Sequence, residues 1–544
     1  MSKSFAQPQA RPLPEAALDE LRTLLGAGAV RTDPASLAGF RDPYAHRSWR
    51  EHEPAVVLEP VSVEQVQEIV RIAGRHLFPL WTFSQGRNYG YGGPAPRQAG
   101  CAAVSLRGLG RILEISEDLA YAVVEPGVRF SDLYAELRRR NLPLWPSIPD
   151  LGWGSVIGNT MDHGVGFTPL GDHPGRACGM EVVLADGSLL RTGMGGQAGN
   201  PAWHVRRHAY GPSAEGIFMQ SNFGIVTKMG CWLVPEPEIY ISADVRIERE
   251  EDIAALLEAV RPLLLDGTIQ NYPIAYNATL VGGAFSGVPR EHWYAGEGSL
   301  PNPAIGKMMA ETDCGAWFMR FALYGPAVIV DEQYAACAAA FGAIPGARMS
   351  ARRMRGCDVH DTLSAAVPPP PGRAGAVGRL RHQSDCTQAG IPTLDLLDNL
   401  SWEDSGAGGH LDYSPIAPLD GQEALRQSQW LRSVFTEHGF DYAASLMITP
   451  RAFINITSVW FNTADEGQTR RAYDFIGRLI GLGADRGYPV YRTHLEYMDA
   501  VAEIFDFNEH AQARFNQRLK GALDPGGIFS PGKQGIWPLR LSAG

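Results

Sequence analysis

A glycine-rich loop that follows a strand-like segment is the feature that most restricts the fold of this 544-residue chain. The segment "PLWTFS" has the pattern of a strand, and "SQGRNYGYGG", residues 84–93, continues from it. Glycine allows positive φ angles and lets another molecule approach the backbone closely. Successive N–H groups in such a loop bind anions. We therefore expect a phosphate site where the strand ends, although a mobile surface turn would have the same composition.

The sequence around this loop predicts an α+β protein whose phosphate site is not of a standard type. Residues 55–130 alternate strand-like and helix-like segments, and Ser62 with Gln65 predicts a capped helix start. Asp186-Gly187 lies between two apolar runs and predicts a hairpin. The loop lacks the G-x-G-x-x-G spacing and the Walker lysine, so neither standard nucleotide motif fits. A second glycine-rich segment occupies residues 145–173.

Composition limits the partners and the compartment. The net charge of -11 disfavours nucleic acid and acidic membrane surfaces as partners. The seven cysteines form no C-x-x-C pair, which predicts reduced thiols, no metal site and no disulfide framework. No apolar run reaches about 18 residues, and the first residues do not resemble a signal peptide. We expect a cytoplasmic protein with no membrane span.

Three groups of residues are candidates for chemistry. Tyr91, with Tyr491-Arg492 in "PVYRTHLEYMD", offers two hydroxyls and a guanidinium that together can hold an oxyanion. Asp172, beside His173 in "PLGDHPG", can serve as a proton acceptor. His410 lies in "GGHLDYSPIA". Each group also has a structural interpretation: a strand end, a turn-capping aspartate and a buried core histidine.

Seven motifs spanning about residues 50–540 resemble the vanillyl-alcohol oxidase and p-cresol methylhydroxylase family of flavoproteins. They are "SQGRNYGYGG", "PDLGWGSVIGNTMDHGVGFTPLGDH", "GMEVVLADGSLLRTGMG", "SNFGIVTKMGCWLVPEP", "GGHLDYSPIA", "YRTHLEYMD" and "DPGGIFSPGKQGIWP". The resemblance implies an FAD-binding domain at residues 1–245, an α+β cap domain at 246–488, and a segment at 489–544 that returns to the FAD domain.

The resemblance also implies residue roles. The residues implied to bind FAD are Ser84, Gly86, Arg87, Asn88, Gly90, Gly154, Ser155, Gly158, Asn159, Ile225, Val226 and Lys533, with His410 as the site of an 8α-histidyl link. The catalytic residues implied are Tyr91, Asp172, Tyr491 and Arg492. Trp153, Asp412 and Asn455 fall in the implied substrate pocket, and there Trp153 and Asp412 depart from the family pattern.

The function that these roles imply is oxidation of para-substituted phenols such as vanillyl alcohol, eugenol or 4-alkylguaiacols. Arg492 and the two tyrosines would stabilise the phenolate, hydride would leave the benzylic carbon, and O2 would be reduced to H2O2. One alternative is a dehydrogenase subunit that passes electrons to a cytochrome, and a second is a flavoprotein without enzymatic activity. Family likeness also implies a homodimer or a higher homo-oligomer.

Overall fold

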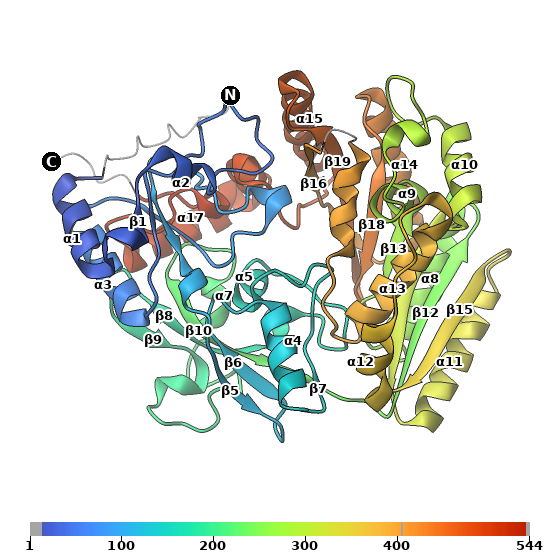
Figure 1. The fold of residues 1–544 in the computed structure, drawn as a ribbon, viewed down its shortest axis with the longest axis horizontal. Coiled ribbons are helices and arrows are strands. Elements are labelled where there is room, and N and C mark those ends of the chain that lie inside the picture. Colours follow the sequence, from blue (N-terminus) through green and yellow to red (C-terminus); the bar gives the residue numbers. More distant parts are fainter. Residues whose placement is uncertain (1–12, 404–405, 540–544) are drawn as a thin grey trace.

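The computed structural model describes residues 13–403 and 406–539 and confirms the α+β class. Figure 1 shows two halves side by side, with the first 235 or so residues and the C-terminal helices in one half. The start of the chain, on which the expectation of no signal peptide rests, lies outside the described residues. Within the described residues, no helix is long and apolar enough to cross a membrane, and no group of three or more ligating side chains could hold a metal.

The first half contains two sheets with helices packed on them. A four-stranded sheet has the order β1-β2-β4-β3, and a five-stranded sheet has the order β5-β6-β10-β8-β9. The strands are β1 Val30–Arg31, β2 Val56–Leu58, β3 Leu80–Phe83, β4 Ala102–Ser105, β5 Ile112–Ser116, β6 Tyr121–Val124, β8 Ala177–Val183, β9 Leu189–Arg191 and β10 Ile225–Trp232. The helices are α1 Glu15–Leu25, α2 Pro34–Ala38, α3 Val63–His76, α4 Phe130–Arg139, α5 Val156–Met161, α6 His173–Arg176 and α7 Glu215–Phe218.

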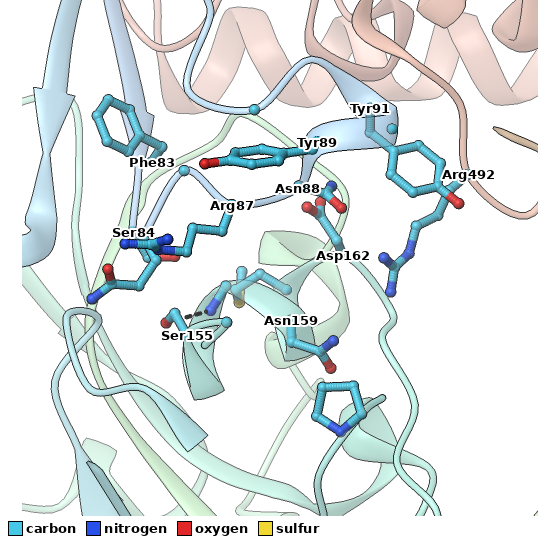
Figure 2. A pocket seen from close by; sticks show the side chains of 18 of the residues that line it. Phe83, Ser84, Arg87, Asn88, Tyr89, Tyr91, Ser155, Asn159, Asp162 and Arg492 are labelled. Atoms are coloured by element: carbon cyan, nitrogen blue, oxygen red, sulfur yellow. Dashed lines mark hydrogen bonds between the residues drawn. The ribbon is translucent and has the colours of Figure 1, made fainter. Parts of the chain in front are cut away.

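Local sequence signals set several of these elements. Ser62 begins α3 by accepting a hydrogen bond from Gln65 N–H at 3.3 Å, as the sequence predicts. The Gln65 side chain bonds the N–H of Val61 rather than that of Ser62. The predicted hairpin joins β8 to β9, with Gly187 at φ +77°. β3 then leads directly into the glycine-rich loop, along which Figure 2 shows Ser84, Arg87, Asn88 and Tyr89.

The C-terminal segment returns to the first half of the molecule. It carries α16 Met498–Glu503 and α17 Phe507–Leu523, and Leu519 and Leu523 of α17 pack against a buried core that β6, α4 and β10 share. Leu80 N–H donates to Ile528 O at 2.7 Å, and Ser530 N–H donates to Leu80 O at 2.7 Å. The buried Lys520 ammonium donates to the carbonyls of Asn222 and Phe529. The end of the chain therefore completes the sheet edge that carries the loop.

The second half is one large antiparallel sheet covered by helices. Its strand order is β15-β12-β14-β13-β18-β19-β16, and β17 also pairs with β19. The strands are β12 Ile239–Ile247, β13 Ile274–Asn277, β14 Trp317–Gly325, β15 Arg348–Arg355, β16 Gly408–Tyr413, β17 Ile416–Pro418, β18 Ala443–Ile448 and β19 Ala452–Asn462. The helices are α8 Ile253–Leu265, α9 Ala278–Phe285, α10 Asn302–Thr312, α11 Ala327–Gly342, α12 Gly356–Ala365, α13 Ala376–Gln388, α14 Gly421–Glu437 and α15 Glu466–Ala484. A short ribbon of β7 Leu144–Trp145 and β11 Val234–Pro235 precedes this sheet. Because β12 belongs to the sheet and begins at Ile239, the sheet starts before the predicted boundary at residue 246.

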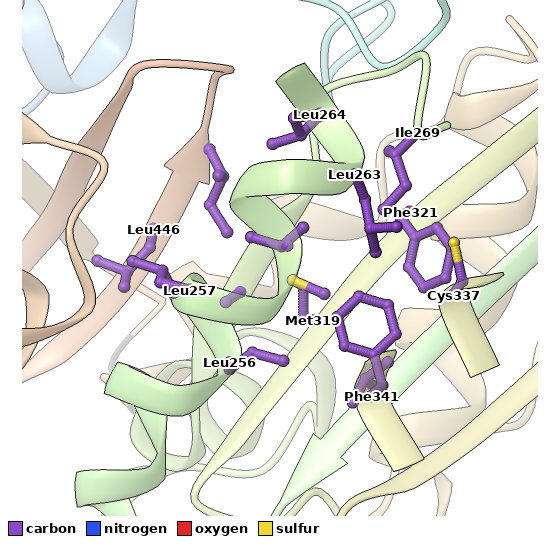
Figure 3. Close-up of a cluster of buried hydrophobic side chains, with 14 of the residues drawn as sticks. Leu256, Leu257, Leu263, Leu264, Ile269, Met319, Phe321, Cys337, Phe341 and Leu446 are labelled. Carbon is purple, nitrogen blue, oxygen red and sulfur yellow. The ribbon is translucent and has the colours of Figure 1, made fainter. Parts of the chain in front are cut away.

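Alternation along the strands separates two faces of this sheet. On β14, Met319 and Phe321 pack with α8 and α11 in the core drawn in Figure 3. The intervening Phe318 packs in a different cluster, on the side of α9 and α13, and Arg320 is fully buried among polar groups on that side. Successive side chains of a strand point to opposite faces, so one face supplies a core and the other is available for a site.

Replacing Phe321 with Ala should remove a fully buried ring from the core of α8 and α11. We expect the free energy of unfolding to fall by about 3–5 kcal/mol, measured by urea denaturation. The matched control is Val328→Ala on α11, whose side chain is 78% exposed, and we expect about 0.5 kcal/mol or less there. Equal losses in the two variants would contradict this assignment of the core.

Candidate functional site

A cavity of about 470 Å³ lies between the glycine-rich loops and the large sheet. Of the residues predicted to form a site, those that line it are Ser84, Gly86, Arg87, Asn88, Gly90, Tyr91, Trp153, Gly154, Ser155, Gly158, Asn159, Ile225, Val226, His410, Asp412, Tyr491, Arg492 and Lys533. Asp172 and Asn455 are not in its wall.

The floor of the cavity forms where the two glycine-rich segments meet. A Cβ on Gly158 would lie 2.2 Å from Ser84 Oγ, so the close packing of α5 against the loop requires glycine at this position. Ser155 begins α5 by accepting a hydrogen bond from Gly158 N–H at 3.0 Å. The Ser155 hydroxyl donates to Pro126 O at 2.6 Å. These contacts fix the spacing between the two loops that face the cavity.

Several polar atoms of the floor lack a partner among the described residues, as expected for a site that receives a polar cofactor. They are Arg87 Nε, Ser221 Oγ, Asn222 Oδ1 and Arg492 Nε, all buried in residues that line the cavity. The Arg87 guanidinium lies 4.6 Å from the centre of the Trp153 ring. A cation, open backbone and unpaired donors fit a diphosphate, so the residues present are compatible with FAD.

The roof of the cavity is one face of the large sheet. Residues two positions apart on four strands line it: Ile274 and Tyr276 on β13, Ser445 and Met447 on β18, Ile456 and Ser458 on β19, and His410 and Asp412 on β16. Asn455 immediately precedes the lining residue Ile456 on β19, so its side chain points away from the cavity, and its Nδ2 donates to Tyr442 Oη. The expected pocket role of Asn455 is therefore wrong, because its strand position has the opposite parity.

An oxyanion-binding group lies at one side of the cavity. The Arg492 carbon Cζ is 5.7 Å from the centre of the Tyr91 ring and 4.9 Å from that of the Tyr491 ring. Arg492 Nη2 donates to Tyr491 Oη at 3.0 Å, and Tyr491 Oη donates to the carbonyl of His163. Figure 2 shows Tyr91 and Arg492 next to each other, with Asp162 facing them across the cavity. The structure thus brings together three residues from opposite ends of the chain.

The electrostatics of this group favour binding an anion. Burial raises the pKa of Tyr91 well above its usual value, and the negative charge of Asp412 adds to the rise. Burial also raises the pKa of Tyr491. Burial lowers the pKa of Arg492, but the neighbouring Tyr491, Tyr91 and Asp162 more than offset it, so the guanidinium stays charged. Two neutral hydroxyl donors and one fixed cation can accept a phenolate.

Asp172 is exposed and caps a short helix, which is its structural interpretation. Its carboxylate accepts a hydrogen bond from Gly175 N–H at 3.1 Å at the start of α6. The neighbouring His173 is buried and contacts Asn159 Oδ1 at 2.6 Å, away from that carboxylate. The paired acid and imidazole expected from the sequence therefore do not act together, because a turn directs them to different places.

Asp150 is the carboxylate that sequence reasoning missed. It lines the cavity, and its Oδ1 accepts hydrogen bonds from Arg320 Nη2 at 2.5 Å and Gln383 Nε2 at 2.7 Å. Arg320 is fully buried on β14 and contacts Tyr276 from the same side. In sequence, Asp150 is marked only by its place inside the second glycine-rich segment, because its partners lie about 170 or more residues away.

Comparison with known proteins identifies the class of fold and site. Residues 54–193 match a family described as an FAD binding domain. The chain is 32% identical over 522 residues to the flavoprotein subunit of 4-cresol dehydrogenase (hydroxylating) from Pseudomonas putida, covering 96% of this chain and 95% of that one. A 4-ethylphenol oxidase from Gulosibacter chungangensis, solved with isoeugenol, has 38% identity and a TM-score of 0.91, covering 98% and 100% of the two chains. A substrate-bound p-cresol methylhydroxylase has 31% identity and a TM-score of 0.88, with 96% and 97% coverage.

Replacing Gly90 with Ala should damage the cavity without unfolding the protein. The new Cβ would lie 2.7 Å from both Asp412 Oδ2 and His410 Cε1, so the loop or β16 must shift. We expect a lower flavin-to-protein ratio after incubation with FAD, measured by absorbance, with an unchanged circular dichroism spectrum. Gly216→Ala, where a Cβ meets nothing within 4 Å, is the control, and full FAD loading of both variants would argue against this geometry.

Proposed function

Because this chain belongs to the vanillyl-alcohol oxidase and p-cresol methylhydroxylase family of flavoproteins, we propose that it oxidises para-substituted phenols at the benzylic carbon and reduces O2 to H2O2. Vanillyl alcohol, eugenol, 4-alkylguaiacols and 4-ethylphenol are the candidate substrates. The observation that carries this proposal is the cationic Arg492 between two neutral tyrosines in the cavity wall.

Arg492, Tyr91 and Tyr491 activate the substrate by holding it as the phenolate. A phenol titrates near pH 10, so ionising it at pH 7 costs about 4 kcal/mol. A hydrogen bond to a charged group contributes about 1.5–3 kcal/mol, so the guanidinium with two hydroxyls offsets this cost. Tyr491 must then turn its hydroxyl from the carbonyl of His163 toward the substrate oxygen. The phenolate donates electron density into the ring, which weakens the benzylic C–H bond.

The cofactor supplies the electron chemistry, and the chain supplies position. FAD, when bound, would supply the acceptor for the hydride that leaves the benzylic carbon. Ser84, Arg87 and the loop backbone hold the phosphates, and Trp153 flanks Arg87. We propose that His410 Nε2 is linked covalently to the flavin.

Asp150 takes the proton-transfer role that the sequence suggested for Asp172. Asp150 lines the cavity, and both described hydrogen bonds to its side chain end on Oδ1, so Oδ2 is the oxygen proposed to take the proton. After hydride loss, a carboxylate there accepts a proton from water that adds to the benzylic carbon, or from an alcohol hydroxyl of the substrate. The bonds from Arg320 and Gln383 keep the carboxylate aimed into the cavity.

A dehydrogenase that passes electrons to a cytochrome is the second candidate, favoured by the 32% identity to the 4-cresol dehydrogenase subunit. The oxidase is the first candidate because identity to the 4-ethylphenol oxidase is higher, at 38%.

We further propose a cytoplasmic homo-oligomer. All seven cysteines are free thiols, which suits a reducing compartment.

Anaerobic mixing with 4-ethylphenol or vanillyl alcohol tests the proposal. We expect the band of oxidised flavin to bleach, then to return with H2O2 when air is admitted. Return of the flavin band only with a dye or a cytochrome would identify the dehydrogenase, and no bleaching with any para-substituted phenol would refute both candidates.

Arg492→Ala should slow bleaching at least about 100-fold, the effect of losing about 3 kcal/mol, with FAD still bound. The exposed Arg426→Ala is the control.

Asp150→Asn and Asp172→Asn compare the two carboxylates directly. We expect Asp150→Asn to lower kcat with vanillyl alcohol by about 100-fold or more, the usual contribution of a general base. Asp172→Asn should retain kcat within about threefold, because that carboxylate only caps an exposed turn. Steady-state peroxide assays give both values, and a larger loss in Asp172→Asn would return the role to that residue.

A further inference from the structure

Asp412 and His410 form a close pair on β16, the strand that ends the large sheet. They are two residues apart and therefore point to the same face, toward the cavity. His410 Nδ1 lies 3.3 Å from Asp412 Oδ1. Asp412 Oδ1 also accepts a hydrogen bond at 2.7 Å from the hydroxyl of Ser458, its partner across the ladder on β19. The carboxylate is thus fixed from its own strand and from the next one.

The surroundings of the pair limit rotation of the imidazole ring. Asp412 is 7% exposed, and the loop backbone at Gly90 closes over both side chains. The Tyr44 ring packs against the His410 imidazole, and the centres of the two rings are 5.1 Å apart. Since an ionised carboxylate can only accept hydrogen bonds, a bond to Nδ1 requires the proton on Nδ1. The remaining nitrogen, Nε2, then carries the lone pair.

We propose, on the basis of the proposed linkage to the cofactor, that Asp412 is a positioning residue that makes His410 Nε2 the nucleophile for covalent attachment of FAD. A bond forms between Nε2 and the 8α-carbon, and one C–H bond of the 8-methyl group breaks and releases a proton. No atom is lost: the electron pair and this one proton pass to the flavin ring, the imidazolium keeps its Nδ1 proton, and the second proton that O2 needs comes from water. O2 then takes two electrons and two protons and leaves as H2O2.

Asp412 assists this step through charge. Alkylation at Nε2 places positive charge on the imidazole ring, and Nδ1–H then forms a charge-assisted hydrogen bond to the carboxylate. Ser458 holds the carboxylate but contributes no charge. The effect of Asp412 should therefore depend on its negative charge.

The rate of attachment tests the proposal. Flavin-free protein from a riboflavin-starved host is mixed with FAD in air, quenched in denaturant at intervals, and scored for flavin fluorescence in the protein band. We expect Asp412→Asn to attach FAD about 10- to 100-fold more slowly than the wild type, while binding it to the same extent before the quench. Asp361→Asn, which removes the charge of an exposed carboxylate outside the cavity, should attach FAD at the wild-type rate, and His410→Ala should attach none. An Asp412→Asn rate equal to that of the wild type would overturn the proposal.

A measurement on the wild type keeps the proposal testable if Asp412→Asn fails to fold. Hydrolysis of the flavin peptide yields a histidyl riboflavin joined through either Nε2 or Nδ1, and the two isomers are separable. The Nε2 isomer supports the role of Asp412, and the Nδ1 isomer refutes it. If the wild type releases all of its flavin on denaturation, this proposal also fails, whereas phenol oxidation by dissociable FAD would leave the main function intact.

Discussion

Each strand can turn only every second side chain toward one face of a sheet, and the cavity depends on that constraint. The odd-numbered β14 positions Met319 and Phe321 pack under α8 and α11, while Arg320 lies on the cavity side. The same alternation brings His410 and Asp412 to the roof and turns Asn455 away. The core that stabilises the large sheet and the cavity wall on its other face are therefore two outcomes of one pattern, and a shift of register by one residue would exchange them.

Charge is the second constraint on this cavity. Arg492 is a permanent cation whose hydroxyl neighbours Tyr91 and Tyr491 are held neutral by burial. Elsewhere in the wall, the carboxylates are already bonded to donors: Asp150 to Arg320 and Asp412 to Ser458. The group around Arg492 is thus the place where an anionic ligand gains most, which orients a phenol before any reaction begins.

Local sequence predicted the parts of the fold that local physics determines. The capped start of α3, the hairpin at Gly187 and the glycine-rich loops follow from short-range hydrogen bonds and permitted φ angles, and all are present. Tyr91, Tyr491 and Arg492 were candidates by side-chain type, but only the family resemblance assigned them catalytic roles, because no spacing links positions 400 residues apart. Asp172 and Asn455 were misjudged for related reasons. A turn decides where Asp172 points, and strand parity decides the same for Asn455. Asp150 was missed because Arg320 and Gln383, which hold it, become neighbours only after the large sheet forms.

The return of the C-terminal segment determines when the cofactor site exists during synthesis. β3 carries the phosphate loop, yet its edge is completed by Ile528 and Ser530, and Arg492 is itself translated late. A ribosome-bound chain that has folded the five-stranded sheet and the large sheet of the second half still lacks the returning segment that walls one side of the cavity. It also lacks Arg492, the cation of the cavity. Such a chain holds an open, partly apolar cleft until its last residues emerge. Capture of FAD by the complete cavity therefore follows the translation of residues 492–530, and the supply of cofactor acts on chains that have passed this point.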